Sequence, residues 1–106
     1  MPRKDRPNVL PLEGEIDLHV SPNVSQSLQS MIEKKPKQLI VDLAQVSYID
    51  SSGLAALIEG MQNIQQYGGT FALVSLQEPV RTIFEIARLD QVFRIYPDVN
   101  AAIEAG

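Results

Sequence analysis

The chain has 106 residues, the size of one domain, and 44% of them are hydrophobic, which is enough to build a core. It contains no cysteine, which excludes disulfides, thiolate metal sites and thiol catalysis. A formal net charge of −4 without a basic stripe argues against direct binding of nucleic acid. No apolar run reaches the roughly 18 residues of a membrane span, and nothing at the start resembles a signal peptide, so we expect a cytoplasmic protein.

The first part of the chain predicts a strand, a turn and a helix. Residues 9–12 are typical of a short strand, in which Pro11 favours an edge position, and residues 14–17 are expected to turn the chain outward. Ser21 before a proline predicts a helix N-cap, and Pro36 is expected to end that helix. The inward face of the helix is predicted from its spacing to hold Val24, Leu28, Met31 and Ile32.

Two buried strands with a helix between them are predicted in the middle of the chain. Residues 39–43 form a continuous apolar run with one acid, which is typical of a strand covered on both faces. A helix is expected to begin at Ser52 or Gly53 and to end at Gly68-Gly69, before a second apolar strand at residues 70–76. The buried face of this helix is predicted to be Leu54, Leu57, Ile58, Met61 and Ile64.

The last part of the chain completes an alternating pattern. A third helix is predicted to open at Glu78, a short strand follows at residues 93–95, and a last helix begins near Asp98. Strands that alternate with helices predict a single small α/β domain with a mainly parallel sheet. We expect this domain to span residues 9–106, after a charged and proline-containing arm at residues 1–8.

The predicted topology brings two polar segments together. Right-handed crossovers place the loops that leave the first two strands at the same edge of the sheet. We therefore expect Glu15 and Asp17 to lie beside Asp50, Ser51 and Ser52, although Glu15 and Asp50 are 35 residues apart in the sequence.

Enzymatic and ligand-binding chemistry finds little support in the sequence. A serine nucleophile would need a base, and His19 is the sole histidine of the chain. No serine lies in the Gly-x-Ser-x-Gly motif that is typical of such nucleophiles. Glu13, Glu15 and Asp17 alternate, but no calcium-binding spacing follows, and a solvated acidic turn is the simpler interpretation. A nucleotide site is disfavoured because there is no glycine-rich phosphate loop and no Lys or Arg between residues 38 and 80. We expect no enzyme activity, no cofactor and no metal.

Two hydroxyl groups at the start of the predicted second helix leave two interpretations open. One of Ser51 and Ser52 is expected to cap the helix, which would stabilise it by about 1 kcal/mol. The other would stand in the loop, accessible to a kinase, and phosphorylation there would add about −1.5 to −2 charges. Beside Asp17 and Asp50, that charge would change a docking surface and leave the fold intact.

A family resemblance favours the second interpretation. The segment Ile49-Asp50-Ser51-Ser52-Gly53-Leu54, together with the upstream Gly14-Glu15-Ile16-Asp17, resembles bacterial anti-sigma factor antagonists of the STAS domain family. The likeness covers roughly residues 9–105. It implies a small α/β fold, with a mixed, mainly parallel sheet of four to five strands packed with about four helices, and no catalytic activity.

The resemblance also implies a mechanism. In this family the unphosphorylated protein binds a serine-kinase anti-sigma factor and so releases the sigma factor. The kinase phosphorylates the serine after the aspartate, here Ser51, and a metal-dependent serine phosphatase reverses the modification. The alternative is a STAS subunit of a lipid-transport or stress-sensing scaffold complex in which Ser51 is not used. The positions that match the family's partner-binding surface are Glu15, Asp17, Asp50, Ser51, Ser52, Gly53 and Leu54.

Two departures from the family pattern concern the fold. The family usually has an additional N-terminal strand, for which residues 1–8 leave little room, so we expect that strand to be short or absent. An exposed sheet edge would follow, and with it we count a weak homodimer among the expected partners. Arg88 stands where a glycine commonly ends the third helix, so this helix is expected to end without a low-cost left-handed residue.

Overall fold

The computed structural model of the protein describes residues 8–106. Within these residues four strands alternate with four α-helices, which confirms the predicted α/β fold. The elements are β1 (Asn8–Ile16), α1 (Ser21–Ile32), β2 (Gln38–Ile49), α2 (Ser51–Gln65), β3 (Thr70–Val74), α3 (Glu78–Ile86), the 3-10 helix η1 (Leu89–Gln91), β4 (Arg94–Tyr96) and α4 (Val99–Ala105).

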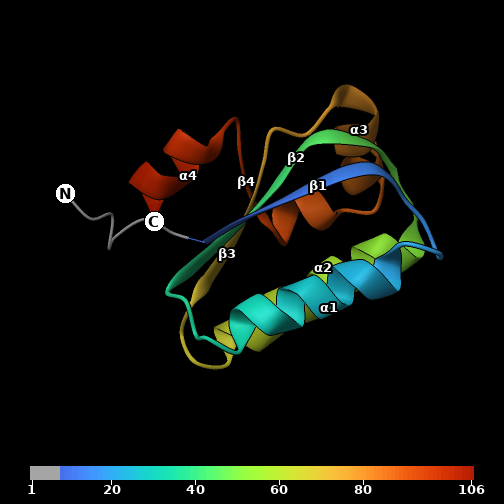
Figure 1. Cartoon of the computed structure of the whole chain (residues 1–106). Coiled ribbons are helices and arrows are strands. Elements are labelled where there is room, and N and C mark those ends of the chain that lie inside the picture. The colour runs from blue at the N-terminus through green and yellow to red at the C-terminus, as the bar shows by residue number, and fades with distance from the viewer. Residues whose placement is uncertain (1–7) are drawn as a thin grey trace.

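The strands form one sheet in the order β1-β2-β3-β4, and every pairing within the described residues is parallel. Helices α1, α2 and α3 lie in the three crossovers that connect neighbouring strands (Figure 1). The register aligns Ile16 of β1 with Ile49 of β2, so these two strands end at the same edge of the sheet. The β1–α1 and β2–α2 loops therefore begin side by side, as predicted for parallel neighbours.

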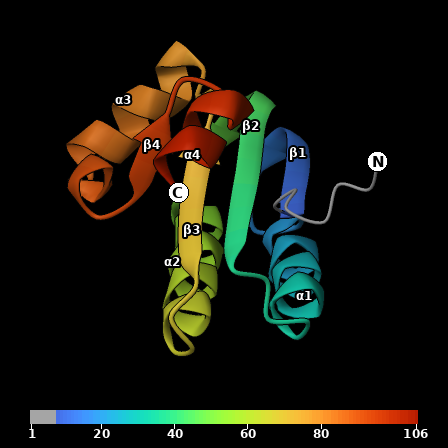
Figure 2. The ribbon, with the colours of Figure 1, turned by 90° about the vertical axis from the view of Figure 1, so that its left-hand side faces the viewer.

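The two faces of the sheet carry cores of different size. Residues of α1, α2 and α3 pack on one face in the main core, where α1 and α2 lie next to each other (Figures 1 and 2). Helix α4 covers a smaller cluster, to which it contributes Ala102. Neighbouring residues of β2 divide between these cores: Val41 lies in the main core and Ile40 in the cluster under α4. Side chains alternate along a strand, so the two clusters lie on opposite faces.

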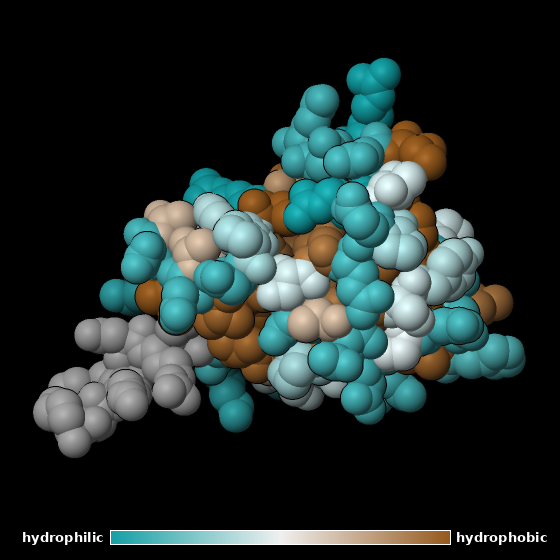
Figure 3. Space-filling model, turned by 90° about the horizontal axis from the view of Figure 1, so that it is seen from above, coloured by the Kyte–Doolittle hydropathy of each residue, from teal (hydrophilic) through white to brown (hydrophobic). Residues whose placement is uncertain are grey.

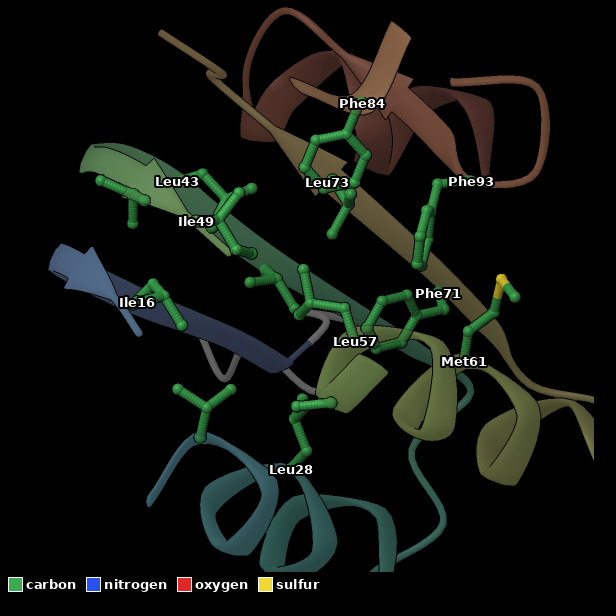
Figure 4. Packing of buried hydrophobic residues seen from close by; sticks show 14 of the residues in the cluster. Ile16, Leu28, Leu43, Ile49, Leu57, Met61, Phe71, Leu73, Phe84 and Phe93 are labelled. Carbon is green, nitrogen blue, oxygen red and sulfur yellow. The ribbon is translucent and has the colours of Figure 1, made fainter. Parts of the chain in front are cut away.

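The main core is filled by aliphatic side chains from the helices and by a small aromatic group. Leu28 of α1 and Leu57 of α2 point toward the sheet (Figure 4). Phe93 packs against Phe71, with ring centroids 6.0 Å apart, and against Phe84 of α3, at 5.7 Å in an edge-to-face arrangement. The predicted apolar face of α2 is confirmed as core, with Leu57, Met61 and Ile64 buried and Leu54 and Ile58 packed against them.

Both strands that lead to the acidic loops are longer than predicted. The interpretation of residues 14–17 as an outward turn is wrong for Gly14–Ile16, because β1 continues through Ile16. Register shifts between Pro11 and Glu13 and between Gly14 and Glu15 keep β1 paired with β2. Gly14 has a φ of 80°, a conformation that glycine adopts without steric cost. Strand β2 extends to Ile49.

One of two predicted helix ends differs in the structure. Ser21 is not the N-cap of α1: it is the first helical residue, and the cap position is Val20, without a side-chain hydrogen bond. Helix α3 ends as expected, without a low-cost left-handed residue: the position after the helix is left-handed, with φ 63° and ψ 20°, but it is occupied by Arg88 and not by a glycine. The left-handed conformation is sterically unfavourable for arginine, because of its Cβ atom, and would not be for glycine.

The N-terminal prediction concerns residues that are mostly outside the described part of the chain. Residues 1–7 of the predicted arm, and with them any additional N-terminal strand, lie outside the described residues. Asn8, which was assigned to the arm, is the first residue of β1. Within residues 8–106, β1 pairs only with β2 and is therefore an edge strand.

The face seen from above is mostly hydrophilic, with separate hydrophobic spots (Figure 3). Within the described residues, no helix combines the length and apolar character needed to cross a membrane. The large hydrophobic side chains that are exposed are Leu18, Tyr48, Ile86, Val92 and Ile103.

Candidate functional site

The predicted site residues meet where β1 and β2 end and where α1 and α2 begin, at the right of Figure 1. We call Glu15, Asp17, Asp50, Ser51 and Ser52 the acidic corner. Strand register places Glu15 opposite Tyr48, two residues before Asp50. The backbone amide of Asp50 donates a hydrogen bond of 3.1 Å to the carbonyl oxygen of Ile16, which ties the two loops together. The expected proximity of the two polar segments is confirmed.

Helix α2 is capped by Asp50. The backbone of Asp50 is extended, with φ −102° and ψ −174°. The Oδ1 atom of its carboxylate accepts hydrogen bonds from the amides of Ser52 (2.9 Å) and Gly53 (3.2 Å). The Ser52 hydroxyl donates a third bond of 2.6 Å to the same oxygen. The prediction that Ser51 or Ser52 would cap the helix is therefore wrong, because the preceding aspartate already satisfies the free amides.

The cap leaves the two serines in different environments. Ser52 is half-buried and held by Asp50. Ser51 is the first residue of α2 and is exposed, and among the hydrogen bonds of residues 8–106 none involves its hydroxyl group. A chemical change at Ser51 would therefore break no hydrogen bond of the described fold.

Gly53 allows α2 to begin directly against the two strand ends. This residue is buried, and a Cβ atom at its position would lie 2.7 Å from Cγ1 of Ile49 and 2.8 Å from Cγ2 of Ile16. Real Cβ atoms do not approach other heavy atoms so closely, so the position requires glycine. Gly53 thus positions the acidic corner, and Leu54 beside it is half-buried against the core.

Asp17 organises the loop on the other side of the corner. Its Oδ1 accepts hydrogen bonds from the amides of His19 (3.0 Å) and Val20 (3.2 Å). Its carbonyl oxygen accepts two more, from the amides of Val20 (3.0 Å) and Ser21 (2.8 Å). These bonds form a tight turn that leads directly into α1.

Comparison with known proteins connects this arrangement to a family. Residues 1–102 match the family model described as the STAS domain. The chain belongs to the STAS domain family. The domain is 32% identical over 82 residues to an anti-sigma-B factor antagonist of Listeria monocytogenes, covering 77% of this chain and 72% of the relative. It is 29% identical over 98 residues to an anti-sigma F factor antagonist of Paenibacillus polymyxa, covering 91% of this chain and 84% of the relative.

The fold agrees with that of a solved anti-sigma factor antagonist. An anti-sigma factor antagonist from Mycobacterium paratuberculosis superposes with a TM-score of 0.83 at 28% sequence identity. The superposition covers 92% of this chain and 82% of the other. The resemblance predicted from the segments around Gly14 and Asp50 is therefore confirmed at the level of the family and the fold.

The acidic corner of this STAS domain is negatively charged, and the strands and helices that form it carry no basic residue to balance this charge. Residues 8–33 and 38–80, which form β1, α1, β2, α2 and β3, contain no Lys or Arg. The hydrogen bond from the Ser52 hydroxyl is the main cause that lowers the pKa of Asp50 below its usual value of 3.8. The amides of Gly53, Ser52 and Leu18 act in the same direction, against the opposing effect of desolvation. Asp50 is therefore an anion at neutral pH.

The STAS fold also exposes apolar side chains at this corner that belong to no sequence motif. Leu18, between Asp17 and His19, is 70% exposed, and Tyr48 is 46% exposed. A large aliphatic residue between two polar ones in a loop is the only signal that the sequence offers for Leu18. Within residues 8–106, no three His, Cys, Asp or Glu side chains come together as a metal site would require.

Proposed function

We propose that this STAS domain is an anti-sigma factor antagonist that works in the cytoplasm as a binding protein without catalytic activity of its own. Its unphosphorylated form binds a serine-kinase anti-sigma factor through the acidic corner and so releases the sigma factor. Phosphorylation of Ser51 ends the binding, and a serine phosphatase restores it. Membership of the STAS family and the names of the relatives support the general function. The exposed hydroxyl of Ser51, which makes no hydrogen bond within residues 8–106 and follows the acidic Asp50, supports the switch.

The proposed contact surface is the set of positions that match the family motif. Ser51 would present its hydroxyl to the kinase, and the adjacent backbone is held in place by the Asp50 cap. Gly53 would act through the close approach of α2 to the strands. The remaining contact positions are Glu15, Asp17, Asp50, Ser52 and Leu54.

Phosphorylation would change the docking surface and spare the fold. A phosphate adds about −1.5 to −2 charges next to the ionised Asp50. The N-terminus of α2 partly accepts this charge, and the Ser51 hydroxyl gives up no hydrogen bond of the described structure. A kinase must bring the γ-phosphate of ATP to this hydroxyl, so a phosphoserine would meet the phosphates of the bound nucleotide. Like charges then oppose docking.

Two substitutions at Ser51 test the proposal. The probe is the kinase-type anti-sigma factor encoded in the same genome, purified and titrated with this protein. We expect Ser51→Asp to lose binding while keeping a near-normal Tm, and Ser51→Ala to bind regardless of ATP. Ser47→Asp is the matched control, because it places the same charge at an exposed position of β2 near the corner. If Ser51→Asp binds as tightly as the wild type, the switch is refuted.

Mass spectrometry separates this function from the alternative. Incubation of the wild type with the kinase and ATP should place one phosphate on Ser51 and none on Ser51→Ala. A STAS subunit of a lipid-transport or stress-sensing scaffold complex would show no such phosphate. Complete absence of phosphate at Ser51 would favour that alternative.

A further inference from the structure

Leu18 is unusual among the hydrophobic residues of this domain. It is 70% exposed, and within residues 8–106 only Ile86, at 78%, is a more exposed large hydrophobic side chain. It belongs to the loop that joins β1 to α1, directly after Asp17 of the acidic corner. An exposed leucine inside a proposed docking surface is a candidate for an energetic anchor, since a few buried side chains supply most of the affinity of an interface.

The backbone that carries Leu18 is held on both sides. Asp17 accepts four hydrogen bonds from the amides that follow Leu18: two through its carboxylate, from His19 and Val20, and two through its carbonyl oxygen, from Val20 and Ser21. Before the turn, Ile16 is fixed by its pairing with Ile49 and by the bond from the Asp50 amide. A side chain presented by an ordered turn loses little backbone freedom on binding, which favours tight association.

The charges around Leu18 indicate the chemistry of the partner. The elements that form the corner carry Glu15, Asp17 and Asp50, and residues 8–33 and 38–80 contain no Lys or Arg. A complementary protein surface would therefore present basic side chains around an apolar depression. Charge complementarity of this kind raises the association rate, whereas burial of the apolar anchor slows dissociation.

We propose that Leu18 is the apolar anchor of the acidic corner and inserts into an apolar pocket of the partner, with Lys or Arg side chains at the pocket rim facing Glu15 and Asp17. This inference rests on the proposed function, because it takes the kinase-type anti-sigma factor as the partner. It adds a residue outside the motif that carries Ser51, and it specifies what the partner must offer.

Three substitutions separate the anchor from the charges. The full-length chain is immobilised and the purified kinase-type anti-sigma factor of the same genome is passed over it, so that association and dissociation are both measured. We expect Leu18→Ala to raise Kd by about tenfold or more, mainly through faster dissociation, with an unchanged salt dependence. Asp17→Asn keeps the oxygen that holds the turn and removes the charge, so it should slow association and weaken the salt dependence. Ile86→Ala, at the other highly exposed aliphatic position, should stay within about twofold of the wild type.

Conservative and polar replacements then test the nature of the contact. Leu18→Met keeps an apolar side chain of similar size and should bind within about threefold of the wild type, whereas Leu18→Gln should lose as much affinity as Leu18→Ala. Equal Tm values of all variants exclude an effect on folding.

If Leu18→Ala binds like the wild type while Ser51→Asp still abolishes binding, the anchor is refuted and the proposed function stands. If Leu18→Ala weakens binding and Ser51→Asp does not, the anchor stands and the switch is refuted. If the wild type does not bind the anti-sigma factor, both are refuted.

Discussion

Gly53→Ala would force an extra carbon into the contact between α2 and the ends of β1 and β2. The new Cβ would lie 2.7 Å from Cγ1 of Ile49, 2.8 Å from Cγ2 of Ile16 and 3.1 Å from the carbonyl oxygen of Ile16. Both isoleucines are buried, so neither can move without disturbing the core. Overpacking of this kind costs about 1–3 kcal/mol, and the better helix propensity of alanine offsets up to about 1 kcal/mol. We expect the free energy of unfolding to fall by about 1–2 kcal/mol.

Equilibrium unfolding in urea, followed by circular dichroism, measures this loss. Gly60→Ala is the matched control, since Gly60 is also a buried residue of α2. There the new Cβ would lie 3.1 Å from the flexible end of Leu28 and 3.3 Å from the ring of Phe71, so side-chain adjustment should keep the cost below about 1 kcal/mol. A Gly53→Ala protein at least as stable as the wild type, or no less stable than Gly60→Ala, would refute the close approach.

Three further predictions concern the core, a helix end and acid stability. Leu57→Ala should lower the free energy of unfolding by about 2–5 kcal/mol because Leu57 is fully buried, whereas Glu59→Ala on the exposed face should stay within about 0.5 kcal/mol in the same urea assay. Arg88→Gly should raise the free energy of unfolding by about 0.5–1 kcal/mol, because glycine adopts the left-handed conformation of this residue without steric cost, and a lower urea midpoint would contradict this. Folding lowers the pKa of Asp50 below 3.8, so its contribution to stability is complete above pH 3.8 and is lost as the pH falls through the folded-state value. The Tm advantage of the wild type over Asp50→Asn should therefore shrink on acidification, and an advantage that grows would show that the sign is wrong.

The sequence patterns predicted the parts of the fold that depend on periodicity. The apolar face of α2 and the buried strand at residues 39–43 are read from side-chain spacing alone. The meeting of Asp17 with Asp50 follows from the rule for parallel crossovers, because it needs only the order of the elements. These predictions did not require knowledge of any particular contact.

The details that failed depend on contacts between distant segments. Asp50, Ser51 and Ser52 are all residue types that favour the N-cap position. The residue that takes this position is Asp50, whose backbone is extended and whose amide is bonded to Ile16, 34 positions earlier in the chain. Gly14 is typical of a turn, but pairing with β2 keeps it in a strand. Leu18 was not predicted as a site residue, because a single apolar residue in a loop forms no periodic pattern.

The assignment of the helix cap to Asp50 has a practical consequence for position 51. Because the carboxylate, and not the Ser51 hydroxyl, holds the first turn of α2, the side chain at position 51 can be exchanged without loosening the helix. The chain has no cysteine, so Ser51→Cys would introduce its sole thiol. A fluorophore attached there would report in real time when a second protein covers this end of the molecule.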